Sequence, residues 1–244
     1  MKMKDKLLVP AVVAIILIVG FTDSGQTPAP KPIGVNLNGK MVTFSKEDGI
    51  SFFCPYFSAQ STVSPNSGVS VCLRYITDYQ RTESPSLFTL SPSTTPLKVD
   101  VLHMNLYNLS RDTYSSQVLK PSIRFLSSGS ETDIWTGVCL TVDSSRNLVQ
   151  VFSRLDMSIR KFLPYPYVWS GEPVIDFSGF DGHLTDVQVW DRPLRYSEVY
   201  SYMTLSSYWS SIGSVLTWSN ISYSIRGKTL LEDSYKWFDN IVYG

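Results

Sequence analysis

Short runs in which apolar and polar residues alternate recur between residues 41 and 218. Such period-two alternation predicts antiparallel strands that bury one face. Gly, Pro, Ser or Asp stand at the ends of these runs, as expected for turns between strands. The predicted strands are residues 41–44, 50–54, 69–76, 86–90, 98–109, 122–126, 135–142, 148–155, 184–191 and 214–218.

Residues 195–205 form the one predicted helix, because Val199, Tyr202 and Met203 share a helical face and Ser197 with Glu198 suits a helix start. About ten strands with one short helix predict an all-β fold, in which two antiparallel sheets form a jelly-roll sandwich. A chain of 244 residues is long enough for one such domain.

The strand at residues 184–191 runs directly into the turn before this helix. Strict alternation would place two sets of side chains on opposite faces of it. One face would carry Leu184, Asp186, Gln188 and Trp190, and the other Thr185, Val187, Val189 and Asp191.

The charges of the chain balance, with 21 Lys and Arg against 21 Asp and Glu. Because no basic excess exists to neutralise phosphates, nucleic acid is not expected as a partner.

The N-terminus predicts export from the cytoplasm. A basic start is followed by an uncharged apolar run at residues 7–21, shorter than the about 20 residues that a membrane span needs. We therefore predict a signal peptide at residues 1–21, a Pro-rich linker at 22–32 and one folded domain at 33–244. The alternative is an uncleaved signal anchor, which would make the chain a type II membrane protein.

Secretion would allow cysteines to form disulfides and asparagines in sequons to carry glycans. In an oxidising compartment, two of the three cysteines, Cys54, Cys72 and Cys139, are expected to pair. Asn108 and Asn220 each begin an Asn-x-Ser sequon and are candidate glycosylation sites.

No catalytic motif accompanies the two histidines, His103 and His183, and the cysteines and histidines show no zinc spacing. We therefore do not expect an enzyme. The aromatic stretch at residues 162–169 makes Tyr165, Tyr167 and Trp169 candidate ligand contacts, since exposed rings can stack on sugars or on a partner protein. The alternative is that these rings cover one face of the sandwich.

Four blocks resemble pentraxins, the family of C-reactive protein and serum amyloid P, in family order. They are SVCLRYITDY at residues 70–79, WTGVCLTVDSSRNLVQVF at 135–152, GHLTDVQVWDRPLRYSEV at 182–199 and SVLTWSNISYSIRGK at 214–228. A more general laminin-G-like sandwich is the alternative. The signature around the second cysteine is altered, because Gly137 and Val142 stand where the family has His and Trp.

The resemblance implies a disulfide between Cys72 and Cys139. Cys54 would then be either a buried strand residue or half of an intersubunit bridge. The resemblance also implies a homo-oligomer, a cyclic ring that usually has five subunits, and a double-calcium site that holds phosphocholine or polysaccharide.

The residues that would bind calcium depart from the family pattern. The family's Asp-Asn pair corresponds to Pro96 and Leu97, which have no side-chain oxygen. The family's acidic loop is deleted before Asp181, so that only Asp176 and Asp181 remain nearby. Calcium needs six to eight oxygen ligands. We therefore expect the metal site to be lost, with no cofactor bound.

These features predict a secreted recognition or assembly protein, for example in innate immunity, that binds an extracellular glycan, lipid headgroup or protein without calcium. One alternative is a membrane-tethered adhesion or receptor ectodomain. The other is a calcium-dependent binder with a remodelled site.

Overall fold

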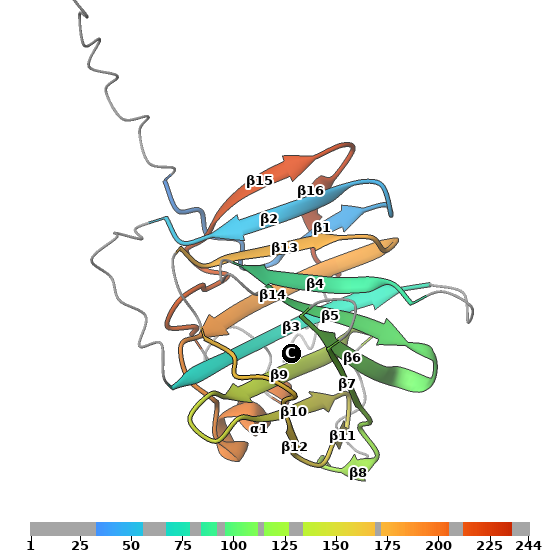
Figure 1. Cartoon of the computed structure of the whole chain (residues 1–244). Helices are drawn as coiled ribbons and strands as arrows, with labels where there is room; N and C mark the ends of the chain where they lie inside the picture. The colour runs from blue at the N-terminus through green and yellow to red at the C-terminus, as the bar shows by residue number, and fades with distance from the viewer. Residues whose placement is uncertain are drawn as a thin grey trace, which may run out of the picture. The chain divides into compact units, whose positions relative to one another are not determined.

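The computed structural model describes residues 33–55, 67–78, 84–91, 96–111, 115–126, 134–168, 172–204 and 212–235. These residues form two antiparallel sheets that pack face to face, with one short helix outside them (Figure 1). The predicted all-β sandwich is therefore confirmed. The predicted signal peptide and linker lie outside the described residues. No helix within the described residues is long and apolar enough to cross a membrane.

The chain crosses between the two sheets several times, with β4 to β7 consecutive in the second sheet and β8 to β12 consecutive in the first. The first sheet has the order β16 (Leu230–Asp233), β1 (Lys40–Phe44), β14 (Gly182–Trp190), β3 (Gly68–Thr77), β9 (Thr136–Asp143), β10 (Leu148–Ser153), β11 (Asp156–Met157) and β8 (Ile123–Arg124), with β12 (Lys161–Phe162) also paired to β10. The second sheet has the order β15 (Ser222–Arg226), β2 (Gly49–Phe53), β13 (Val174–Ser178), β4 (Ser86–Ser91), β5 (Leu97–Leu102), β6 (Leu106–Ser110) and β7 (Ser116–Leu119).

The described residues form two apolar clusters. The larger one fills the space between the sheets, where Phe52 packs edge-on against Phe177 and Trp218 with ring centroids 5.9 and 5.3 Å away. The smaller one lies on the outer face of the first sheet, beneath helix α1 (Tyr196–Thr204). Val199 and Tyr202 are the buried residues of this helix, on the face that the sequence predicts.

Several predicted strands differ in the structure, and the predicted strand at 122–126 is reduced to the two residues of β8. Residues 98–109 divide into β5, a 3-10 turn η1 (His103–Asn105) and β6, because Asn105 takes a left-handed φ of 56° and reverses the chain. Asparagine is among the few non-glycine residues that tolerate this region. Residues 214–218 form isolated bridges through Leu216 and Thr217, without a regular strand.

β14 contains a bulge that breaks the strict alternation predicted for it. Pairing with β3 shifts between Thr185 and Gln188, and Asp186 takes a φ of 53°. As a result Leu184 joins Val187 and Val189 in the core between the sheets. The expectation that Leu184 shares a face with Asp186 is therefore wrong, because the bulge exchanges the two faces at this point.

Candidate functional site

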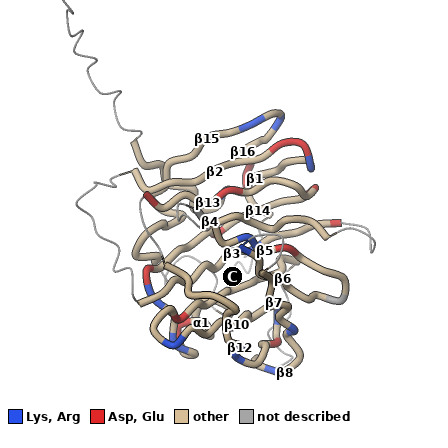
Figure 2. The backbone as a smooth tube through the Cα atoms, in the orientation of Figure 1, with Lys and Arg blue, Asp and Glu red and all other residues tan. Residues whose placement is uncertain are grey.

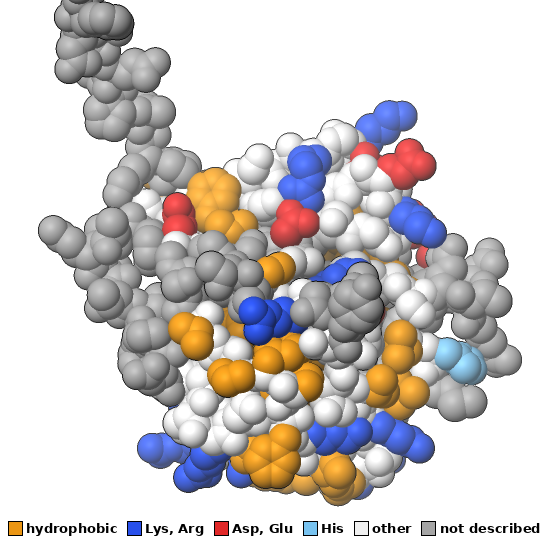
Figure 3. All heavy atoms as spheres, viewed as in Figure 1, with side chains coloured by type: hydrophobic (Ala, Val, Ile, Leu, Met, Phe, Trp, Pro, Cys, Tyr) orange, Lys and Arg blue, Asp and Glu red, His pale blue; other side chains and the backbone are white. Residues whose placement is uncertain are grey.

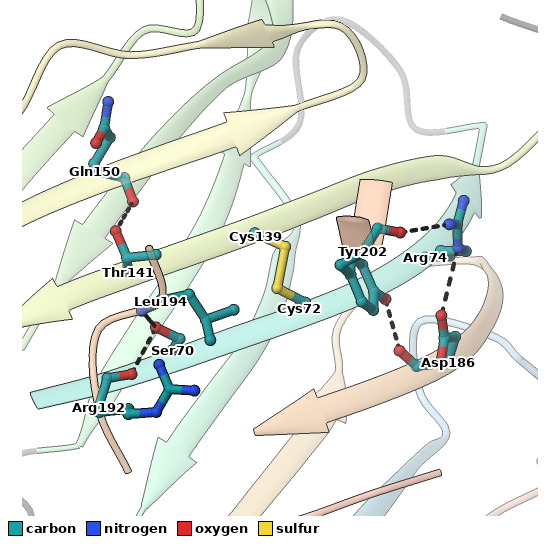
Figure 4. Close-up of a disulfide and its surroundings, with 10 residues drawn as sticks. All are labelled: Ser70, Cys72, Arg74, Cys139, Thr141, Gln150, Asp186, Arg192, Leu194 and Tyr202. Carbon is teal, nitrogen blue, oxygen red and sulfur yellow. Dashed lines mark hydrogen bonds and ion pairs between the residues drawn. A yellow bond between two sulfur atoms is a disulfide. The ribbon is translucent and has the colours of Figure 1, made fainter. Parts of the chain in front are cut away.

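A disulfide joins the two central strands β3 and β9 of the first sheet. Cys72 lies directly opposite Cys139 in the strand register, and their sulfur atoms are bonded (Figure 4). Both residues are fully buried beneath α1. The implied pairing is confirmed. Cys54 is half-buried and unpaired within the chain, so an intersubunit bridge stays a prediction.

The entry into α1 is fixed by the Glu198 carboxylate. Its Oε2 accepts a hydrogen bond from the backbone N–H of Arg195 at 2.7 Å, as the third helical residue does in a capping box. The guanidinium of Arg192 donates to both oxygens of the same carboxylate, at 2.9 and 2.7 Å. This pair lowers the pKa of Glu198 and holds the segment before the helix in place.

A buried polar network lies beside the disulfide, under the C-terminal end of α1 (Figure 4). Arg74 Nε lies 3.5 Å from Asp186 Oδ2, and Arg74 Nη2 donates to the backbone oxygen of Tyr202 at 3.0 Å. The Tyr202 hydroxyl donates to the backbone oxygen of Asp186 at 2.7 Å, and Gln188 donates to Asp186 Oδ1 at 3.1 Å. These contacts join β3, the bulge of β14 and the end of α1 below the surface.

Burial raises the pKa of Asp186 to about 6, although Arg74 and three hydrogen bonds act in the opposite direction. Desolvation of the charged carboxylate is therefore larger than the attraction of the nearby guanidinium. The same burial raises the pKa of the Tyr202 hydroxyl, which stays protonated as a donor.

This shift predicts a pH dependence of stability. Below about pH 4 Asp186 is protonated in the folded and unfolded states. Between pH 4 and the folded value of about 6 only the folded state keeps the proton, so the free energy of unfolding falls as pH rises, by up to about 3 kcal/mol. Asp186→Asn removes this contribution and tolerates the left-handed φ.

Urea denaturation of the wild type and of Asp186→Asn at pH 4, 5, 6 and 7 tests this, because other carboxyl groups cancel in the difference between the two proteins. The advantage of the wild type should shrink from pH 4 to pH 6 and then stay constant. A difference independent of pH would show that the pKa of Asp186 is unshifted.

Asp176, one of the two carboxylates near the deleted calcium loop, lies in the middle of β13 and is held by protein groups. Ser51 and Ser178 donate to its two carboxylate oxygens at 2.6 and 3.1 Å. Arg226 Nη2 lies 2.7 Å from Asp176 Oδ1, and Arg226 Nη1 bonds Ser51 Oγ at 2.6 Å. A guanidinium from β15 therefore supplies the positive charge at this carboxylate.

The other positions of the implied site supply few oxygen ligands. Asp181 Oδ1 accepts the backbone N–H of Lys46 at 2.9 Å. Pro96 is exposed, and Leu97 is buried in the core. Across the described ranges, no three His, Cys, Asp or Glu side chains are grouped as a metal would need. The described residues therefore do not fit the double-calcium site.

His183 contacts a hydroxyl without activating it. Thr43 Oγ1 donates its proton to Glu232 Oε2 at 2.6 Å and lies 2.9 Å from His183 Nδ1. Because the hydroxyl has one proton and gives it to Glu232, His183 must donate to Thr43 here. The contact ties β1 to β14 and β16.

The predicted aromatic contacts divide between buried and exposed positions. Tyr167 is 2% exposed, so its candidacy as a surface ligand contact is wrong, because its ring packs into the core. This burial raises the pKa of its hydroxyl. Tyr165 is half-buried, and the guanidinium of Arg111 lies 4.9 Å from its ring centroid. Trp169 lies outside the described residues.

The two sequons occupy different environments. Asn108 is half-buried in the middle of β6, paired with Asp100 and Val118 on the neighbouring strands. Asn220 is exposed in the turn that it closes with Thr217. Glycosylation of either residue stays a prediction.

Comparison with solved structures identifies the fold. The heptameric SAP-like pentraxin from Limulus polyphemus superposes with a TM-score of 0.62 at 16% identity, over 82% of this chain and 98% of that one. The full extracellular region of zebrafish Gpr126/Adgrg6 superposes with a TM-score of 0.52 at 18% identity, over 82% of this chain and 27% of that one. The chain has a pentraxin-like jelly-roll fold.

Looser likenesses extend to a carbohydrate-binding module of a Ruminococcus gnavus sialidase, with a TM-score of 0.45 at 13% identity, over 66% of this chain and 96% of that one. No protein-family model and no curated protein matches the sequence. The fold is therefore shared at low sequence identity, and the likeness alone does not indicate the ligand.

Proposed function

We propose that this chain is an extracellular recognition and assembly protein of the pentraxin type that binds its ligand without calcium and without catalysis. The ion pair between Asp176 and Arg226, at 2.7 Å, carries this proposal. A calcium ion at Asp176 would have to displace a guanidinium and two serine hydroxyls, and would find too few carboxylate oxygens in return.

Export is supported by the disulfide between Cys72 and Cys139, because such bonds persist mainly in oxidising compartments. It agrees with the signal peptide predicted at residues 1–21. The likeness to the extracellular region of Gpr126/Adgrg6 favours a second candidate, a membrane-tethered adhesion ectodomain. A mature N-terminus near residue 22 supports the secreted form, and retention of residues 7–21 in the membrane fraction supports the tethered one.

Assembly into a ring is the second part of the proposal. The SAP-like pentraxin from Limulus polyphemus is heptameric, which supports assembly of this chain. Homo-oligomers commonly close into symmetric rings. Light scattering of the purified protein, coupled to size exclusion, measures the number of subunits. A monomer at micromolar concentration would remove assembly from the proposal and leave recognition in place.

Calcium titration tests the central claim. We expect no heat of binding. The melting temperature should be the same in about 2 mM calcium and in about 2 mM chelator, because a metal bound only to the folded state must stabilise it. Arg226→Ala is the matched variant, since it frees the Asp176 carboxylate. Micromolar calcium binding by the wild type would overturn the proposal.

A further inference from the structure

A groove of about 220 Å³ lies on the outer face of the first sheet, where the chain crosses β9 and β10 on its way into α1. Ser70 fixes its wall, since this buried hydroxyl donates to the backbone oxygen of Arg192 and accepts from the backbone N–H of Leu194, both at 2.9 Å (Figure 4). Leu148 and Phe152 contribute apolar lining from β10. We call this hollow the arginine groove, after Arg146, Arg160 and Arg195 in its lining.

Positive charge dominates the arginine groove. Its lining holds three arginines and one acidic residue, Asp143. Arg146 lies 3.9 Å from Asp143 and is 70% exposed, so this pair is weak. No ion pair is recorded for the Arg195 guanidinium within the described residues, and Glu198 nearby is already bound at both oxygens by Arg192. Figures 2 and 3 show further Lys and Arg at this end of the molecule, around α1, β12 and β8.

Neutral polar groups and one aromatic ring share the lining with the arginines. Gln150 orients Arg160, because its Oε1 accepts from Arg160 Nε at 3.4 Å while its Nε2 donates to the backbone oxygen of Ser158 at 2.7 Å. Thr141 adds a hydroxyl beside Gln150. Tyr196 is 53% exposed and offers part of its ring.

We propose that the arginine groove binds one acidic sugar unit of a glycan. The carboxylate or sulfate of this sugar contacts the guanidinium groups of Arg160 and Arg195. Guanidinium groups match such anions with paired hydrogen bonds. Asp143, Thr141 and Gln150 can exchange hydrogen bonds with ring hydroxyls, and an aromatic ring packs on a sugar's apolar face. The volume of the groove lies below the about 300–1,000 Å³ of sites for drug-sized ligands. The groove therefore suits a ligand of about the size of one sugar ring.

The inference rests on the proposed calcium-independent recognition and gives it a ligand class. A sugar is favoured over an acidic peptide because the groove combines hydroxyl partners with a ring in a hollow closed by Pro193 and Leu194. A peptide or a nucleic acid would instead respond to the charge of the whole basic end.

The test is calorimetric titration of the full secreted protein with a sulfated heparin disaccharide, its desulfated uronic-acid counterpart and maltose, all in chelator. We expect one or both acidic disaccharides to bind and maltose not to bind. Arg160→Ala/Arg195→Ala should weaken binding at least about tenfold, since each lost hydrogen bond to a charged group is a large fraction of the affinity of a small ligand. Both side chains are on the surface, so an unchanged melting temperature will show that the variant folds.

Arg124→Ala is the matched control, because Arg124 is an exposed arginine at the same end that does not line the groove. Its affinity should equal that of the wild type. An equal loss in this control, binding of maltose, or no binding of either acid in the absence of calcium would each overturn the inference. If the acids bind only with calcium, the proposed function fails as well. If calcium titration stays silent and the acids do not bind, the ligand class alone fails.

Discussion

Replacing both disulfide cysteines, Cys72→Ala/Cys139→Ala, is expected to lower the free energy of unfolding by about 4 kcal/mol. The bond closes a loop with a sequence separation of 67 residues, and without it the unfolded chain regains the entropy of that loop. Urea denaturation monitored by tryptophan fluorescence will measure the change. The double variant avoids leaving a single buried thiol behind.

Cys54→Ala is the control, since this half-buried cysteine forms no disulfide within the chain. It should cost less than about 1 kcal/mol, as small changes at half-buried positions do. The wild type unfolded in reducing agent should match the double variant. If reduction leaves the midpoint unchanged, the fold draws its stability from packing alone, and the loop-entropy argument is wrong.

Arg74→Met is expected to cost about 3–5 kcal/mol at pH 7, because it leaves Asp186 buried without its cation. The change also removes the hydrogen bond to the backbone oxygen of Tyr202 and the guanidinium 5.5 Å from its ring centroid. The second variant, Arg74→Met/Asp186→Asn, removes the stranded charge and should regain at least about 1 kcal/mol.

Arg124→Met is the exposed counterpart, since Arg124 pairs with Asp156 at 3.5 Å while its side chain is 61% exposed. Its cost should stay below about 1 kcal/mol. Equal effects of Arg74→Met and Arg124→Met in urea denaturation would contradict the assignment of Arg74 and Asp186 to a buried, desolvated pair.

The sequence predicts the sandwich well, because alternation is a local property that each strand carries in its own residues. It fails at β14, where the left-handed φ of Asp186 moves Leu184 to the other face. The reason is that Asp186 forms a buried ion pair with Arg74, which is distant in sequence. Strands β13 and β15 are also missing from the predicted set. The residues of β13 alternate in burial, whereas β15 is mostly exposed at the edge of its sheet.

The candidate site divides in the same way. The departures from the calcium pattern at Pro96, Leu97 and the shortened segment before Asp181 could be inferred from the sequence. The arginine that binds Asp176 could not, since β13 and β15 meet only through β2, which lies between them. The arginine groove could not be predicted either, because its lining comes from β9, β10, the segment that holds Arg160 and the entry into α1.

The order of strands in the first sheet constrains how the protein folds. β1 pairs with β14 and β16, so that Val42 lies opposite Leu184 and Leu231, which are far from it in sequence. Such non-local pairing slows folding, because a long loop must close before its contacts form. During synthesis neither edge of β1 has its partner strand until residues 182–190 have left the ribosome. We therefore expect refolding to be slow, on the order of seconds, and production to depend on chaperones that shield this early strand.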